Sequence, residues 1–170
     1  INYRFDTPDL ALSKSGRALR LRQDQKCILT FKGPTSLEDG VRVRAEYEVE
    51  VSDIGNARAI LTGLGYMQTV IYEKFRTAYR YNDLEITLDE LPYGNFSEIE
   101  GADSASIQAA ARVLALNWEA CIQASYLELF DRFKKSRALI MTDLTFKDFA
   151  SIAVTLHDLG VKPADNPAYL

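Results

Sequence analysis

The chain has 170 residues with 47% hydrophobic and 26% charged side chains, which suits one globular domain with room for an appendage. A net charge of -4 argues against broad binding to nucleic acid, and the single histidine, His157, all but excludes Ser-His-Asp triads and histidine-rich zinc sites. No apolar run approaches the ~20 residues that span a bilayer, and Cys27 and Cys121 have no metal or redox spacing, so we expect a soluble cytoplasmic protein without a membrane partner.

From Ile1 to about Gly101, apolar and polar side chains alternate between turn signals, which is the period of strands with one buried face. Asn82 and Asp83 predict a tight hairpin between the fifth and sixth strands. Between the fourth and fifth strands, Asp53 predicts the start of a helix that lies against the sheet. We predict antiparallel strands near residues 2–6, 17–23, 26–33, 41–51, 69–81, 84–91 and 95–100.

After the last predicted strand the apolar period becomes helical. Asp103 predicts the start of one helix, Asn117 the start of a second and Thr145 the start of a third. The third helix would be a packing or homodimerisation element. We therefore predict an α+β fold, with a β domain over residues 1–135 and a helical extension over residues 136–170.

Charged side chains of both signs fall on one face of successive strands, because residues of equal parity in a strand share a face. Arg20 and Arg22 alternate with leucines, and Lys32 lies on the other face of its strand from Phe31. The long fourth strand places two further arginines and three glutamates on one face, namely Arg42, Arg44, Glu46, Glu48 and Glu50. The whole candidate set is Arg20, Arg22, Lys32, Arg44, Glu46, Glu48, Lys74, Arg76, Asp89, Glu98 and Glu100.

The pattern alone leaves two interpretations open. In one, the sheet exposes its charged face to water, where mixed charges are common. In the other, the sheet closes into a tunnel with the charges inside, and a polyanion with metal ions neutralises them. Guanidinium and ammonium groups bind phosphate oxygens, and carboxylates are ligands that Mg2+ accepts. The sequence has neither a GxxxxGK[ST] loop nor a GxGxxG motif, which disfavours a P-loop nucleotidase.

Eight short stretches occur in a specific order: DTPDLAL at 6–12, ALRLR at 18–22, LTFKGP at 29–34, RAEYE at 44–48, YEKFR at 72–76, LDELP at 88–92, GNFSEIEG at 94–101 and SYLEL at 125–129. Each is weak by itself. As an ordered set they resemble the CYTH superfamily of class IV adenylyl cyclases, thiamine triphosphatases and triphosphate tunnel metalloenzymes. The resemblance covers roughly residues 2–131.

This resemblance implies a closed or nearly closed antiparallel β-tunnel of about eight strands with helices packed outside. It implies Mg2+ or Mn2+ as the cofactor and a small-molecule triphosphate or nucleotide as the partner. It assigns triphosphate binding to Arg20, Arg22, Lys32, Arg44, Lys74 and Arg76. It assigns metal binding to Glu46, Glu48, Asp89, Glu98 and Glu100, with Glu48 or Asp89 as the catalytic carboxylate that orients water.

One departure concerns the amino terminus. The family opens with a strand that carries a Glu-x-Glu-x-Lys signature, and this sequence starts at Ile1 without it. Two metal-side carboxylates and a phosphate-side lysine are therefore absent, and we expect that a preceding strand is missing from the chain.

Three functions follow from these observations. Hydrolysis of inorganic triphosphate, or of an ester such as thiamine triphosphate, is favoured because it demands least of the site. Class IV adenylyl cyclase activity, which converts ATP to cyclic AMP and pyrophosphate, is the alternative. A non-catalytic polyphosphate-binding module is the third. The sequence does not identify a pocket for a base, so it does not choose among substrates.

Overall fold

A computed structural model describes residues 1–165 and divides the chain into two compact units. Unit 1 comprises Ile1–Glu73 and Thr142–Thr145, and unit 2 comprises Lys74–Met141 and the segment from Phe146 onward. This grouping differs from the predicted boundary at residue 135. Whether residues 1–135 and 136–170 form separate domains stays a prediction, and the last five residues of that extension lie outside the described part.

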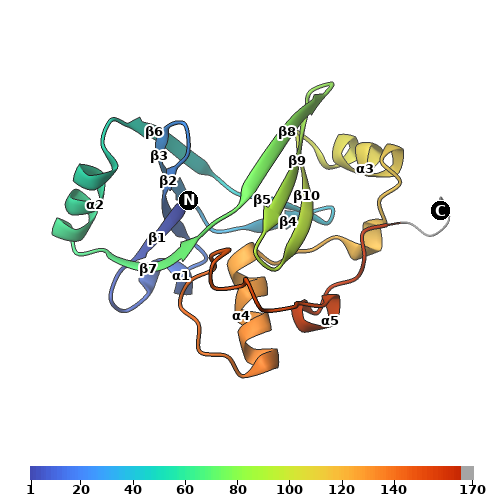
Figure 1. Cartoon of the computed structure of the whole chain (residues 1–170). Coiled ribbons are helices and arrows are strands. Elements are labelled where there is room, and N and C mark those ends of the chain that lie inside the picture. Colours follow the sequence, from blue (N-terminus) through green and yellow to red (C-terminus); the bar gives the residue numbers. More distant parts are fainter. Residues whose placement is uncertain (166–170) are drawn as a thin grey trace. The chain divides into compact units, whose positions relative to one another are not determined.

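Unit 1 is built on a five-stranded sheet whose neighbouring strands are all antiparallel (Figure 1). The strand order is β6-β3-β2-β1-β7. A separate short hairpin and two helices complete the unit. The elements are β1 (Asn2–Asp6), α1 (Ala11–Lys14), β2 (Ala18–Gln23), β3 (Cys27–Lys32), β4 (Ser36–Glu38), β5 (Val41–Val43), β6 (Glu46–Val51), α2 (Ile54–Gly63) and β7 (Met67–Tyr72).

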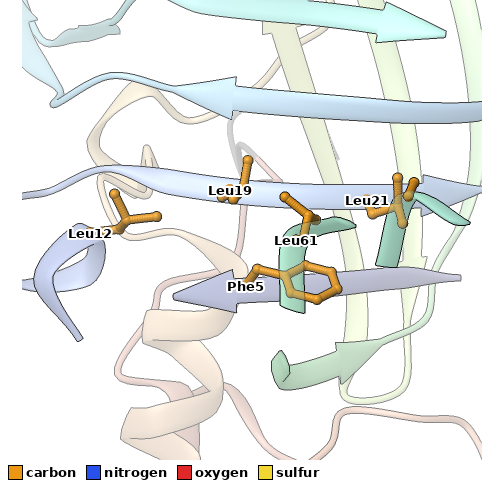
Figure 2. Close-up of a cluster of buried hydrophobic side chains, with 6 residues drawn as sticks. Phe5, Leu12, Leu19, Leu21 and Leu61 are labelled. Atoms are coloured by element: carbon orange, nitrogen blue, oxygen red, sulfur yellow. The ribbon is translucent and has the colours of Figure 1, made fainter. Parts of the chain in front are cut away.

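One face of this sheet is apolar and packs against α2. Leu19 and Leu21, which alternate with the arginines of β2, join Phe5 and Leu61 in a buried cluster (Figure 2). Leu21 has no exposed surface, and full burial of such a side chain contributes about 1.5–3 kcal/mol. The Asp53 side chain caps α2 as predicted, by accepting a hydrogen bond from the amide of Asn56 at 2.5 Å. Burial of the leucine face fixes the opposite, charged face of β2 as the face away from α2.

Unit 2 contains a three-stranded antiparallel sheet in the order β10-β9-β8 (Figure 1). Its core includes three aromatic rings from the helices and the carboxyl-terminal segment. Phe149 lies 5.4 Å from Phe133 and 6.0 Å from Phe130 between ring centroids. The elements are β8 (Phe75–Tyr81), β9 (Leu84–Leu91), β10 (Gly94–Glu100), α3 (Ser104–Val113), the 3-10 turn η1 (Trp118–Ala120), α4 (Tyr126–Arg137) and α5 (Leu156–Leu159).

All seven predicted strands correspond to strands in the structure, but the two longest are each divided. The predicted strand 41–51 separates into β5 and β6, because the Gly33 amide bonds to the Ala45 carbonyl at 2.8 Å and β5 pairs with β4 instead of β3. The predicted strand 69–81 separates into β7 and β8. The Glu73 amide there bonds to the Leu144 carbonyl at 2.9 Å, and β8 pairs with β9 in the other sheet.

Two helix predictions were wrong in extent. Asn117 caps only the short η1, and α4 begins separately after Ser125, which forms a capping box with Glu128. No helix begins at Thr145. The single turn α5 begins later, after Thr155, whose side chain accepts a hydrogen bond from the Asp158 amide.

The structure confirms a mixed α+β fold with antiparallel sheets, and Asp103 caps α3 as predicted. Each sheet is hydrogen-bonded within its own unit, so closure of the strands into one tunnel stays a prediction. No helix among residues 1–165 is both long enough and apolar enough to cross a bilayer.

Candidate functional site

The charged face of unit 1 crosses four strands in register. Arg4 of β1 lies opposite Arg20 of β2, Arg20 lies opposite Thr30 of β3, and Thr30 lies opposite Glu48 of β6. Directly opposite residues in antiparallel strands project from the same face of the sheet. The register therefore aligns these four side chains in one row.

Hydrogen bonds connect this row. The Nη2 atom of Arg20 donates to Oγ1 of Thr30 at 3.1 Å and to Oε1 of Glu48 at 3.3 Å, and the Thr30 hydroxyl donates to the same Glu48 oxygen at 2.7 Å. Arg20 Nε is buried and has no hydrogen-bond partner among residues 1–165. Buried donors are nearly always satisfied, and an ordered water or a ligand oxygen could supply the acceptor that residues 1–165 do not.

A second ion-pair group lies on the same face. Oε1 of Glu46 accepts from Lys32 Nζ at 2.6 Å and from Arg44 Nε at 3.0 Å. Burial lowers the pKa of Lys32, although the bond to Glu46 opposes this shift. Burial alone would raise the pKa of Glu46, but the bond to Lys32 and the charge of Arg44 lower it.

Arg22 lies at the border of this face. It is opposite Asn2 of β1, and its Nε atom lies 3.3 Å from Oδ2 of Asp24. This buried Nε has no bond of hydrogen-bonding geometry within residues 1–165. Arg22 therefore resembles Arg20 in having an unsatisfied Nε atom, but its neighbouring carboxylate is Asp24 and not Glu48.

The candidate residues of unit 2 gather around Asp89, whose side chain is fully buried. Its Oδ2 atom accepts from Lys74 Nζ at 2.6 Å, from Arg76 Nη2 at 2.6 Å and from the Tyr126 hydroxyl at 2.9 Å. Its Oδ1 atom accepts from Arg76 Nε at 2.6 Å. Burial alone would raise the pKa of Asp89, but the bonds from Arg76 and Lys74 lower it, so this carboxylate stays ionised.

Glu98 and Glu100 extend this group along β10. Glu98 accepts from Nη2 of Arg76, and Glu100 lies at the exposed end of the strand, opposite Glu85. Burial raises the pKa of Tyr126, and the charges of Glu98 and Asp89 raise it further. The Tyr126 hydroxyl therefore remains a donor across the physiological pH range.

The structure thus brings the candidate residues together in two groups. Unit 1 groups Arg20, Lys32, Arg44, Glu46 and Glu48, and unit 2 groups Lys74, Arg76, Asp89 and Glu98. Arg22 and Glu100 lie at the edges of these groups. Their predicted functional roles stay predictions.

Sequence reasoning missed Arg4, Thr30 and Tyr126. Arg4 and Thr30 could have been found from the sequence. Each lies directly opposite Arg20 on a neighbouring strand, so strand pairing places both on the charged face. Tyr126 had none beyond its place in the SYLEL stretch. Its contact with Asp89 depends on how α4 packs in unit 2, which strand parity does not report.

Two carboxylates of unit 1 could serve as ligands of a divalent cation. Glu46 and Glu48 lie two residues apart on one face of β6, and within residues 1–165 only Oε1 of each accepts a hydrogen bond. The Oε2 atoms are hard oxygen ligands without a protein donor. No three acidic, histidine or cysteine side chains gather into a metal-binding group in the described residues. Mg2+ commonly binds through one or two carboxylates and completes its shell with phosphate oxygens and water.

Relatives of known name share much of this chain. A Methanocaldococcus jannaschii protein named as a candidate adenylate cyclase is 28% identical over 136 residues, which cover 74% of this chain and 77% of the relative. A solved Pyrococcus horikoshii structure has 28% identity and a TM-score of 0.61, over 76% of this chain and 81% of that one.

A third comparison supports the fold alone. The structure of a Hippeastrum protein, described as a candidate adenylyl cyclase with a dominant triphosphatase activity, has 20% identity and a TM-score of 0.58. It covers 76% of this chain and 80% of its own.

The family comparison covers most of the chain. The model of the CYTH domain matches residues 1–120, which include all ten strands and every basic and acidic residue of the two groups. The match agrees with the ordered stretches in the sequence and with the antiparallel sheets of the structure. The chain belongs to the CYTH domain family.

Proposed function

We propose that this chain hydrolyses inorganic triphosphate, or a triphosphate ester such as thiamine triphosphate, with Mg2+ or Mn2+. The observation that carries the proposal is the buried Nε of Arg20, which lacks an acceptor on a face that also presents Lys32 and Arg44. A phosphate oxygen would supply the missing acceptor through a charge-assisted hydrogen bond. Membership of the CYTH family favours the same substrate class.

The two groups would have different tasks. In unit 1, Arg20, Lys32 and Arg44 would bind phosphate oxygens, and Arg22 would add a guanidinium at the border. In unit 2, Asp89 holds Lys74 and Arg76 in fixed positions, and those two cations would bind phosphate.

Between the two proposed catalytic carboxylates, the contacts favour Glu48. Both oxygens of Asp89 are occupied by Lys74, Arg76 and Tyr126. Oε2 of Glu48 accepts no bond within residues 1–165, so it can accept a proton from an attacking water. A bound divalent ion would neutralise charge on the phosphates as the terminal phosphorus is attacked.

We also propose that the working form is the closed antiparallel tunnel that the family resemblance implies. Two observations support it: the strands of both units are antiparallel, and each unit carries a group of paired charges, which in unit 1 includes an excess of cations. Such faces suit an enclosed polyanion better than bulk water. A tunnel requires that substitutions in either unit weaken binding of the same triphosphate molecule.

Adenylyl cyclase activity is the second candidate, because the Methanocaldococcus relative is named for it. The same cations would hold ATP, and the ribose 3'-hydroxyl would attack the α-phosphorus with pyrophosphate as the leaving group. The two activities differ in product and not in phosphate binding.

The decisive experiment identifies products. Purified protein is incubated with inorganic triphosphate, thiamine triphosphate or ATP, each with Mg2+, Mn2+ or EDTA. Metal-dependent release of orthophosphate supports the hydrolase, and cyclic AMP with pyrophosphate supports the cyclase. Tight binding of triphosphate without turnover would indicate a polyphosphate-binding module and would contradict the proposal.

Glu48→Gln tests the role of the carboxylate. We expect turnover to fall about 100-fold or more while triphosphate still binds, since a general base typically contributes 10²–10⁴-fold. Glu50→Gln is the matched control, because Glu50 lies on the same strand face but pairs with the exposed Lys26. Equal activity of both variants would exclude Glu48 as the base.

A further inference from the structure

Arg4 occupies the middle of β1, an inner strand of the five-stranded sheet between β2 and β7. It lies directly opposite Arg20, so two guanidinium groups project from the same face of neighbouring strands. Like charges in that relation destabilise a sheet. An anion between the two guanidinium groups would remove this repulsion, and residues 1–165 do not place a carboxylate there.

The charges on this face do not balance. Arg4, Arg20, Lys32 and Arg44 are four cations, and within residues 1–165 only Glu46 and Glu48 pair with them, which leaves two positive charges in excess. Glu50 pairs with Lys26, outside this set.

Arg4 has no compensating partner of its own. Its guanidinium makes no hydrogen bond or ion pair within residues 1–165, and it is half-buried. Asp6, on the same strand, uses its oxygens to accept from Thr7, Leu12 and Ser13 instead. Burial lowers the pKa of Arg4, and the nearby Arg20 and Arg44 charges act in the same direction, whereas Tyr72 and Asp6 act in the opposite direction.

We propose that Arg4 is a further triphosphate-binding residue, which with Arg20 forms a pair of guanidinium groups that bind one phosphate group. The proposal rests on the triphosphate specificity proposed above and adds a residue and a position to it. A phosphate oxygen would satisfy Arg20 Nε, remove the repulsion across β1 and β2, and neutralise the excess charge.

This arrangement predicts opposite effects on stability and on binding. Arg4→Met removes the repulsion, so the ligand-free protein should unfold at the same or a higher temperature than the wild type. The same substitution should weaken binding of inorganic triphosphate roughly tenfold to hundredfold, the size expected for one charge-assisted contact. Titration calorimetry in EDTA measures the binding without metal-dependent turnover.

Three variants make the test specific. Arg17→Met removes the same charge at an exposed position of unit 1 outside the charged face, and it should bind triphosphate like the wild type. Arg20→Met should weaken binding if the face holds triphosphate at all. Arg4→Lys keeps the charge but loses the planar fork, so it should bind between the wild type and Arg4→Met.

The outcomes separate the two proposals. If Arg20→Met weakens binding and Arg4→Met does not, the inference about Arg4 is wrong and the proposed substrate stands. If Arg4→Met lowers the unfolding temperature of the ligand-free protein as well as the affinity, Arg4 has a structural role and the inference is again overturned. If the wild type neither binds triphosphate in EDTA nor releases orthophosphate from it with Mg2+ or Mn2+, both proposals fail.

Discussion

Tyr126 connects the helix α4 to the charged group of unit 2 through a single hydroxyl. That hydroxyl donates to buried Asp89 at 2.9 Å, and the ammonium of Lys74 lies 5.3 Å from the ring centroid. Tyr126→Phe keeps the ring and removes only the donor. We expect the free energy of unfolding to fall by about 1.5–3 kcal/mol, the range for a hydrogen bond to a charged group, as measured by urea denaturation.

The control for this prediction is Tyr79→Phe. Tyr79 lies on β8 of the same unit with 53% of its surface exposed, and a change of its hydroxyl should alter stability by less than about 0.5 kcal/mol. Equal stability of the wild type and Tyr126→Phe would show that the bond to Asp89 contributes nothing net.

For single residues, the alternation of side chains along each strand predicted which charged residues share a face of the sheet. Arg20, Lys32, Glu46 and Glu48 share a face as predicted, because each strand alternates and burial of the leucine face fixes its orientation. The contacts of Asp89 needed a further fact, the packing of α4, which depends on tertiary contacts and has no period in the sequence.

Among the helices and strands, the correct predictions were those that depend on residues close together in the sequence. The caps at Asp53 and Asp103 and the Asn82 hairpin were correct, because each depends on side-chain bonds or backbone angles within a few residues. The divisions of strands 41–51 and 69–81 could not be predicted, since alternation continues through both breaks. They depend on distant partners such as the carbonyl of Leu144.

The capping box of α4 gives a prediction at this scale. The Ser125 side chain accepts from the Glu128 amide at 3.3 Å, and Glu128 accepts from the Ser125 amide at 2.6 Å. Ser125→Ala should reduce the free energy of unfolding by about 1 kcal/mol, the usual loss for an N-cap serine. Ser151→Ala, in an exposed turn of the same unit, should leave it unchanged. Urea midpoints with equal m-values make the comparison, and equal midpoints would contradict the prediction.

In the whole molecule, negative charge predominates by sequence, yet the candidate site of unit 1 is locally positive. Folded contacts lower the pKa values of four carboxylates, Asp6 and Glu46 in unit 1 and Asp89 and Asp158 in unit 2. Acid should therefore destabilise both units.

Asp6 allows this effect to be measured at one position. Burial alone would raise the pKa of Asp6, but bonds from Ser13, Leu12 and Thr7 lower it, so the folded state binds fewer protons than the unfolded state. The stabilisation is complete above the ordinary carboxyl pKa of about 4 and is lost as pH falls through the lower, folded value.

Asp6→Asn should therefore be less stable than the wild type by about 2 kcal/mol at neutral pH, because a neutral amide replaces a carboxylate that accepts several hydrogen bonds. The difference should shrink as the pH falls below about 4, where the unfolded wild-type chain gains a proton at Asp6 while the folded state resists it. Asp83→Asn, at the exposed hairpin between β8 and β9, is the control and should be as stable as the wild type at neutral pH. Urea denaturation across this pH range tests the prediction, and a difference between Asp6→Asn and the wild type that stays constant with pH would exclude ionisation of Asp6 as its cause.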